Sequence, residues 1–280
     1  MASSAAALEE SPRRIVERTR GHQHGPIVRL MSPSDLGQRL KPFVFLDFID
    51  TVGSASTGSG MHPHSGITTL TYLMQGSVNY LDTGGKAGVL VQDGVEWMKA
   101  AGGAWHGGGF RESVRTRGFQ LWIALPPELE LGPSESTYLP PTAVPRDGPA
   151  RVVLGSYGSA HSTLSAPSPI NYLAVHLQAG ERWRYQPPPG HVVCWVALSA
   201  GRMLATEALQ AGDLAVFESS NAPIDFEAEH DTEFVLGSAV QHAHRLVLGQ
   251  YSVHTSAAAL RQAEERIEHI KGRLLAEGRL

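Results

Sequence analysis

The sequence contains one cysteine, no long apolar run and no cluster of basic residues. Cys194 is the single cysteine among the 280 residues, so no disulfide can form within the chain. This favours a reducing compartment. No stretch approaches the ~18 consecutive apolar residues of a membrane-spanning helix, and the N-terminus lacks the apolar core of a signal peptide. The net charge is −4 and basic residues occur at most in pairs, which argues against direct nucleic-acid binding. We therefore expect a soluble cytoplasmic protein with no membrane association and no direct nucleic-acid partner.

Glycine and proline, by contrast, are abundant and divide the chain into short segments. There are 30 Gly and 18 Pro, a density that long helices rarely tolerate. Apolar runs at residues 43–48, 69–74, 78–81, 89–91, 95–98 and 119–125 end at turn signals, and those at 69, 78 and 89 start roughly 8–12 residues apart. This spacing is typical of an all-β sandwich or barrel.

The strand pattern stops after residue 125 and then starts again. Seven prolines between residues 126 and 150 favour an extended linker, and strand-like runs resume at Arg151. The halves are weakly similar, since Met74-Gln-Gly-Ser has a counterpart in Ser199-Ala-Gly-Arg, at an offset of 125 residues. We therefore predict two similar barrels in tandem, over residues 13–125 and 151–254, joined by a linker over 126–150.

The last part of the chain has a different pattern, without the frequent breakers. Apolar residues recur in steps of three and four after residue 255, and Thr255 or Ser256 can cap a helix there. This periodicity predicts an amphipathic C-terminal helix over residues 255–276, whose apolar face consists of Leu260, Ala263, Ile267, Ile270 and Leu274. The face can pack on the protein's own barrel or form a dimer contact.

Three histidines are the candidate metal ligands. His62 and His64 occupy alternate positions where a strand pattern begins, so both imidazoles are expected on one face. His106 follows the Gly102-Gly103 turn, and three imidazoles in an apolar barrel would suit Fe, Mn, Ni, Cu or Zn. The spacing alone is not specific, because His22/His24 and His242/His244 show it too. We interpret those two pairs as solvated or structural.

Longer motifs around the three histidines carry a family resemblance. They are the run at residues 61–82 (MHPHSGITTLTYLMQGSVNYLD), the segment 93–98 (DGVEWM), Gly103-Ala-Trp-His and the C-terminal Gly249-Gln-Tyr-Ser-Val-His-Thr. In these segments, and over residues ~13 to ~272, the chain resembles the pirin family, which has the cupin fold. The resemblance implies two cupin barrels, with one transition-metal ion, iron first among the candidates, on His62, His64 and His106 of the N-terminal barrel.

The chain also departs from the pattern of that family. Pirins usually carry a glutamate two residues after the third histidine, where this chain has Gly108, and another four residues after the second, where it has Thr68. Without them a three-histidine site leaves the metal charge uncompensated and lacks an obvious base, unless Glu112 folds back. In the second barrel, Pro187 and Pro189 stand where ligands would be, so no metal is expected there.

The resemblance implies two classes of function. One is a quercetin 2,3-dioxygenase-like oxidoreductase, which acts on a small aromatic chelating substrate of the flavonol type together with O₂. The other is a metal-dependent, redox-sensing binding protein that modulates a partner protein, and a metal-free degenerate pirin is a third reading. Since a chelating substrate and O₂ both need open coordination positions, the three-histidine set favours the dioxygenase. The sequence identifies no catalytic residue beyond the candidate metal ligands.

Overall fold

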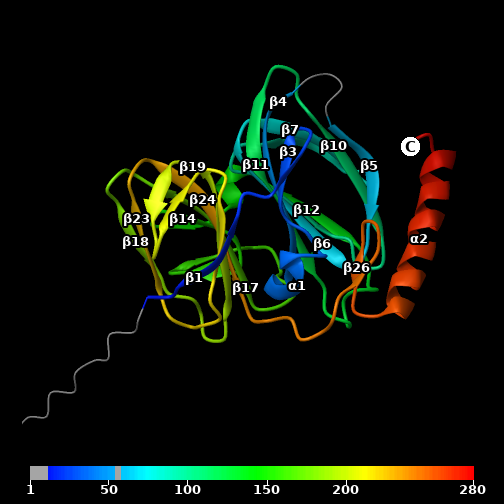
Figure 1. Cartoon of the computed structure of the whole chain (residues 1–280). Coiled ribbons are helices and arrows are strands. Elements are labelled where there is room, and N and C mark those ends of the chain that lie inside the picture. Colours follow the sequence, from blue (N-terminus) through cyan, green and yellow to red (C-terminus); the bar gives the residue numbers. More distant parts are fainter. Residues whose placement is uncertain (1–11, 54–57) are drawn as a thin grey trace, which may run out of the picture.

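The computed structural model describes residues 12–53 and 58–280, and it contains two β-barrels side by side (Figure 1). Strands dominate both halves, and the one long helix, α2 (Ala257–Ala276), lies against the outer side of the first barrel. The predicted all-β fold with tandem barrels and a C-terminal helix is confirmed. No helix in the described ranges is both long and apolar enough to cross a membrane.

The first barrel consists of a seven-stranded and a four-stranded sheet. The larger sheet has the order β12 (Glu135–Leu139), β9 (Val95–Lys99), β6 (Ile67–Gln75), β11 (Arg115–Ala124), β4 (Phe43–Val52), β3 (Ile27–Met31) and β2 (His22–His24). The smaller sheet has the order β5 (Gly58–His64), β10 (Ala104–Phe110), β7 (Ser77–Asp82) and β8 (Ala87–Val91). A short helix, α1 (Leu36–Leu40), precedes β4.

The second barrel repeats this division into seven and four strands. Its larger sheet has the order β1 (Ile15–Thr19), β22 (Leu214–Phe217), β19 (Val193–Ala200), β24 (Thr232–Ala239), β17 (Ile170–Leu177), β14 (Ala150–Leu154) and β13 (Arg146–Asp147). Its smaller sheet has the order β18 (Arg182–Tyr185), β23 (Ile224–Ala228), β20 (Arg202–Leu204) and β21 (Ala208–Gln210). The matching sheets account for the weak internal repeat. Two-stranded pairs, β15 (Ser156–Tyr157) with β16 (Ala160–His161) and β25 (Val247–Leu248) with β26 (Val253–His254), complete the strands.

The two large sheets pack against each other through one shared apolar core. Side chains from both halves belong to this cluster, and Phe43 of β4 meets Trp195 of β19 edge to face at 5.4 Å. Edge-to-face packing is a favoured geometry for aromatic pairs. The second barrel therefore packs on the large sheet of the first barrel. The small sheet of the first barrel, which carries the candidate ligands, lies on the side away from the second barrel.

The first described strand, β1, belongs to the larger sheet of the second barrel and not to the first barrel. Because β1 pairs with β22, part of the segment assigned to residues 13–125 completes the second barrel's sheet. Arg13 is buried beside it, and its Nε donates a hydrogen bond to the Glu218 carbonyl at 2.7 Å. The proline-rich segment also contributes strands to both barrels, since β12 pairs with β9 and β13 pairs with β14. The domain boundaries themselves stay a prediction.

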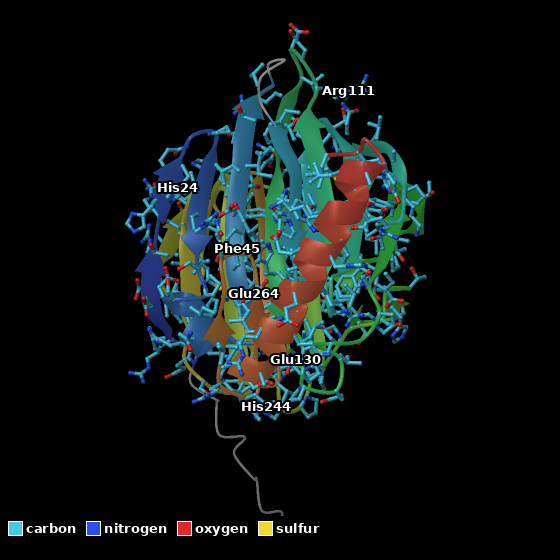
Figure 2. All side chains as sticks on the ribbon, turned by 90° about the vertical axis from the view of Figure 1, so that its right-hand side faces the viewer. His24, Phe45, Arg111, Glu130, His244 and Glu264 are labelled. Atoms are coloured by element: carbon cyan, nitrogen blue, oxygen red, sulfur yellow. The ribbon has the colours of Figure 1, made fainter. Side chains whose placement is uncertain are left out.

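Helix α2 begins where the sequence predicts and covers the small sheet of the first barrel. Ser256 is its N-cap, and the Ser256 hydroxyl accepts a hydrogen bond from the Ala259 N–H at 3.2 Å. Ile267 packs on Trp105 of β10, whose indole N–H donates to the Ile267 carbonyl at 3.2 Å. Figure 2 shows the helix crossing this face of the barrel, with Glu130 near its first turn. The helix therefore packs on its own barrel.

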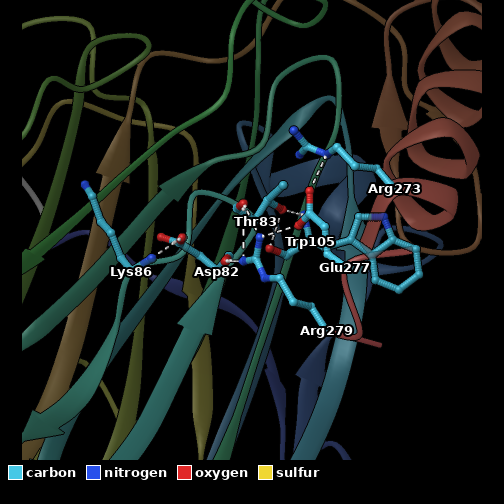
Figure 3. Close-up of polar contacts among 7 residues, drawn as sticks. All are labelled: Asp82, Thr83, Lys86, Trp105, Arg273, Glu277 and Arg279. Atoms are coloured by element: carbon cyan, nitrogen blue, oxygen red, sulfur yellow. Dashed lines mark hydrogen bonds and ion pairs between the residues drawn. The ribbon is translucent and has the colours of Figure 1, made fainter. Parts of the chain in front are cut away.

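The residues after α2 are also tied to the first barrel. Arg279 donates to the Asp82 carbonyl at 2.8 Å, and the neighbouring Thr83 hydroxyl donates to the Trp105 carbonyl at 2.7 Å (Figure 3). Glu277 pairs with Arg279 at 3.1 Å. These contacts join the end of the chain to the strand that carries His106.

Candidate metal centre

The pairing of β5 with β10 brings the three predicted histidines together. In this antiparallel pair, His106 lies directly opposite His62, and His64 lies opposite Ala104. The centroids of the three rings form a nearly equal triangle, at 5.0 Å for His62–His64, 4.7 Å for His62–His106 and 5.1 Å for His64–His106. One ring nitrogen from each histidine lies within 4.8 Å of the other two. The strands therefore present three converging imidazoles.

Each imidazole is fixed by a hydrogen bond through its other nitrogen. The Nδ1–H of His62 donates to the Gly60 carbonyl at 2.8 Å, and that of His64 donates to the Tyr251 carbonyl at 3.0 Å. The Nδ1–H of His106 donates to a carboxylate oxygen of Glu96 at 2.9 Å. Because these acceptors place the proton on Nδ1, the lone pairs remain on Nε2, as metal-bound histidines require.

Two of the free nitrogens are buried without any partner. His64 Nε2 and His106 Nε2 have no hydrogen bond within the described part of the chain, although His64 is 1% and His106 3% exposed. Buried polar nitrogens normally find a partner, so this pair is an exception that a bound cation would explain. The donor set and its orientation thus fit a transition-metal ion.

Burial also keeps the imidazoles of the first strand neutral. Burial, followed by the nearby His106, lowers the pKa of His62 to about 4, against the opposing effect of the Gly60 carbonyl. Burial lowers the pKa of His64 well below its ordinary value in the same way, again with help from His106 and His62. Neutral imidazoles are the form that binds metals, so the site is prepared for a cation near neutral pH.

Sequence reasoning missed one functional candidate, Glu96. Its strand, β9, is buried at four of its five positions, and Glu96 itself is only 6% exposed. One carboxylate oxygen accepts from His106, and the other accepts from the Thr71 hydroxyl at 3.3 Å. The signal was available in the sequence, because a charged residue inside the apolar run Val-Glu-Trp-Met is unusual unless it has a partner.

The two positions at which the family resemblance implies glutamates, 108 and 68, have other roles in this chain. Gly108 lies on β10, and a Cβ placed on it would be 2.3 Å from the Asn79 carbonyl oxygen, so the space for a side chain is closed. Thr68 is fully buried in β6. Glu112 is exposed in the turn after β10. The carboxylate beside the histidines is therefore Glu96, and Glu112 does not fold back to the site.

The C-terminal segment before α2 supports the strand that carries His64. Besides the contact from Tyr251, the Val253 N–H donates to the Ser65 carbonyl at 3.2 Å, and Ser65 Oγ lies 2.9 Å from His254 Nε2. His254 in turn donates to Glu130 at 2.9 Å. This serine–histidine–glutamate arrangement is similar to a hydrolase triad, but Ser65 is 0% exposed, so the arrangement serves to join the two segments.

A small cavity, half open to solvent, lies next to His106. Its volume is about 70 Å³, and its wall includes Leu73, Val78 and Phe110 beside the polar Glu96 and His106. A space of this size holds a few water molecules, since one water needs roughly 10–15 Å³ on this measure. His62 does not line this cavity; it is only partly buried, and the ring of Tyr251, a residue that is 39% exposed, lies 6.2 Å from the His62 ring.

The two other His-x-His pairs lie away from this centre. His22 and His24 are exposed on β2. The rings of His242 and His244 are 5.3 Å apart in the segment between β24 and β25, and His242 is buried. Among the described residues, the cluster of metal-ligating side chains is the one formed by the three predicted histidines.

Comparisons with known proteins agree with the fold and with the motifs. The Pirin family model matches residues 26–123. A pirin-like protein of Caulobacter vibrioides is 30% identical over 213 residues, which are 70% of this chain and 73% of that protein. A Pseudomonas aeruginosa protein provisionally named quercetin 2,3-dioxygenase is 29% identical over 226 residues, covering 75% of this chain and 79% of its own.

Two solved structures show the same fold. A quercetin 2,3-dioxygenase from Acinetobacter baumannii has a TM-score of 0.85 and 24% identity, and the match covers 93% of this chain and 98% of that one. The bacterial pirin YhhW of Escherichia coli, solved in complex with nickel(II), has a TM-score of 0.65 and 20% identity, covering 82% of this chain and 98% of that one.

Proposed function

Because the chain belongs to the pirin family, we propose that it is a dioxygenase whose transition-metal ion is held by His62, His64 and His106. Iron is the first candidate for the ion, with Mn, Ni, Cu and Zn as alternatives. The observation that carries the proposal is the pair of buried Nε2 atoms without partners, on His64 and His106. The nickel(II) complex of a structural relative supports the same assignment.

The proposed substrate is a small aromatic chelator of the flavonol type, together with O₂. A bound divalent ion would lower the pKa of a coordinated hydroxyl group, so the substrate can supply the anion that a missing base would otherwise create. The partly exposed side of His62 is the open approach, and Tyr251 offers an aromatic ring there against which a planar molecule can stack. On the inner side, Trp122 packs edge to face on His64 at 4.8 Å.

One observation favours a second candidate, a metal-dependent binding protein that acts on a partner protein. The cavity at His106 is about 70 Å³, whereas pockets for small organic ligands are roughly 300–1,000 Å³. A flavonol would therefore have to bind at the rim near His62 instead of inside the barrel. A protein that only senses the state of its metal needs no such room. For either function we place the protein in the cytoplasm, since its one cysteine, Cys194, is a buried free thiol.

Oxygen uptake separates the two candidates. Metal-loaded protein is mixed with quercetin, and O₂ consumption is followed with an electrode across the pH range 6 to 9. The dioxygenase proposal expects sustained uptake that is lost in a His62→Ala/His64→Ala double variant. Uptake that is absent at every pH in protein shown to contain its metal would refute the dioxygenase and leave the binding protein.

A further inference from the structure

One of the three imidazoles at the centre has a different kind of partner from the other two. His62 and His64 each donate to a neutral backbone carbonyl, whereas His106 donates to the carboxylate of Glu96 at 2.9 Å. From this contrast, and resting on the proposed metal site, we infer that Glu96 is a positioning residue that compensates the charge of the ion through His106. Glu96 would compensate the charge of the ion through the ligand His106, whereas a coordinating carboxylate compensates it by binding the ion itself.

The surroundings of Glu96 show that its charge needs a cation. The side chain is 6% exposed, and within the described residues its ion-pair partner is His106, with no lysine or arginine beside it. A buried carboxylate without a compensating charge is costly. A divalent ion bound to Nε2 of His106 would supply the compensating positive charge, separated from Glu96 by one imidazole ring. The hydrogen bond to Glu96 polarises the Nδ1–H, and this makes Nε2 a stronger electron-pair donor to the ion.

The geometry also distinguishes positioning from proton transfer. Both carboxylate oxygens are already engaged, one by the His106 N–H and the other by the Thr71 hydroxyl at 3.3 Å. The carboxylate therefore fixes the orientation of the His106 ring and raises the electron density on it. Neither of its oxygens is free to accept a proton from a substrate on the side of His62. The same contacts explain how the chain keeps a negative charge at the centre even though position 108 has no room for a side chain.

Two substitutions at this position separate charge from shape. Glu96→Gln keeps the length of the side chain and its accepting oxygen but removes the charge, whereas Glu96→Asp keeps the charge and shortens the reach. Glu112→Gln is the matched control, because it makes the same chemical change at an exposed carboxylate away from the centre. Each purified protein is loaded with Co²⁺, and its affinity is measured by competition with a chelator. The visible spectrum of the bound Co²⁺ and the reduction potential of the iron-loaded form are recorded alongside.

We expect Glu96→Gln to weaken Co²⁺ binding by about 10-fold or more, within the 10–100-fold range for partners of metal-bound histidines. Its iron should also have a higher reduction potential, since the lost charge stabilises Fe³⁺ more than Fe²⁺. Glu96→Asp should lose less than Glu96→Gln, and Glu112→Gln should match the wild type. If Glu96→Gln retains the wild-type Co²⁺ affinity and reduction potential while Glu96→Asp does not, Glu96 acts through its shape alone and the inference is wrong. Wild-type protein that binds no metal would instead overturn the proposed function and the inference with it.

Discussion

The glycines at the end of β10 lie closer to neighbouring backbone than a side chain permits. A Cβ on Gly108 would be 2.3 Å from the Asn79 carbonyl oxygen, whereas non-bonded heavy atoms prefer roughly 3.5–4.0 Å. Asn79 lies on β7, which pairs with β10, so a side chain at position 108 requires the two strands to separate by roughly 1 Å. Replacing Gly108 therefore tests whether the backbone itself excludes the carboxylate that the family resemblance implies at this position.

We expect Gly108→Ala to lower the free energy of unfolding by about 2 kcal/mol, within the range for overpacked sites. That loss corresponds to a fall in Tm of about 3 °C for a chain of this size. Gly60→Ala is the matched control in the same sheet, because a Cβ there meets nothing within 4 Å, and it should change stability by less than about 0.5 kcal/mol. Chemical denaturation and thermal melts of both variants provide the measurement.

The same clash decides what a glutamate at this position would do. Gly108→Glu must destabilise the protein at least as much as Gly108→Ala, and it should not tighten metal binding in a chelator competition. The reasoning would be refuted if Gly108→Ala were as stable as Gly60→Ala. It would also be refuted if Gly108→Glu held Co²⁺ more tightly than the wild type.

Two further predictions follow from the histidines. Metal analysis of purified protein should find about one transition-metal ion per chain, lost in His62→Ala/His64→Ala and kept in His242→Ala/His244→Ala, and metal retained in the first variant would contradict the assignment. Burial, followed by the charges of His244 and Lys41, lowers the pKa of His242 to about 4, so His242 stays neutral in the folded state. Because the unfolded chain takes up that proton near pH 6.5, stability should fall by about 2 kcal/mol between pH 7 and pH 5 on account of His242. Urea unfolding should show this part of the loss removed in His242→Gln, and an unchanged pH dependence would count against it.

Much of the fold could be predicted because its signals are local. Turn residues at regular intervals predicted the strands, and the helix periodicity predicted α2 (Ala257–Ala276) with its cap at Ser256. Two of the three ligand candidates, His62 and His64, were found in the same way, since alternate residues share a face of one strand. His106 was named as the third candidate because it follows the Gly102-Gly103 turn, and the family resemblance supported joining it to the other two.

What could not be predicted depends on contacts between distant segments. The strand pairing that puts β1 into the second barrel's sheet leaves no local trace, so the segment from residue 13 onward was assigned to the first barrel. The role of Glu96 depends on β9 lying close enough to β10 for a hydrogen bond across the barrel. The closed space at Gly108 likewise depends on the approach of β7. In each case the residue type was visible, and its partner was not.

The helix contributes to the centre without touching it, because strands alternate their side chains between two faces. On β5 and β10, His62 and His106 point inward, while Met61 and Trp105 point outward and pack in one cluster with Ile267 of α2. A slip of β10 by one residue would send His106 to the outside and Trp105 to the inside, and every ligand contact would be lost. Burial of a large apolar side chain contributes roughly 1.5–3 kcal/mol, and the Trp105 indole also donates to the Ile267 carbonyl. The packing of α2 on Trp105 therefore stabilises the observed register of β10. In this way the apolar face of α2 helps to keep the three imidazoles in place without contacting them.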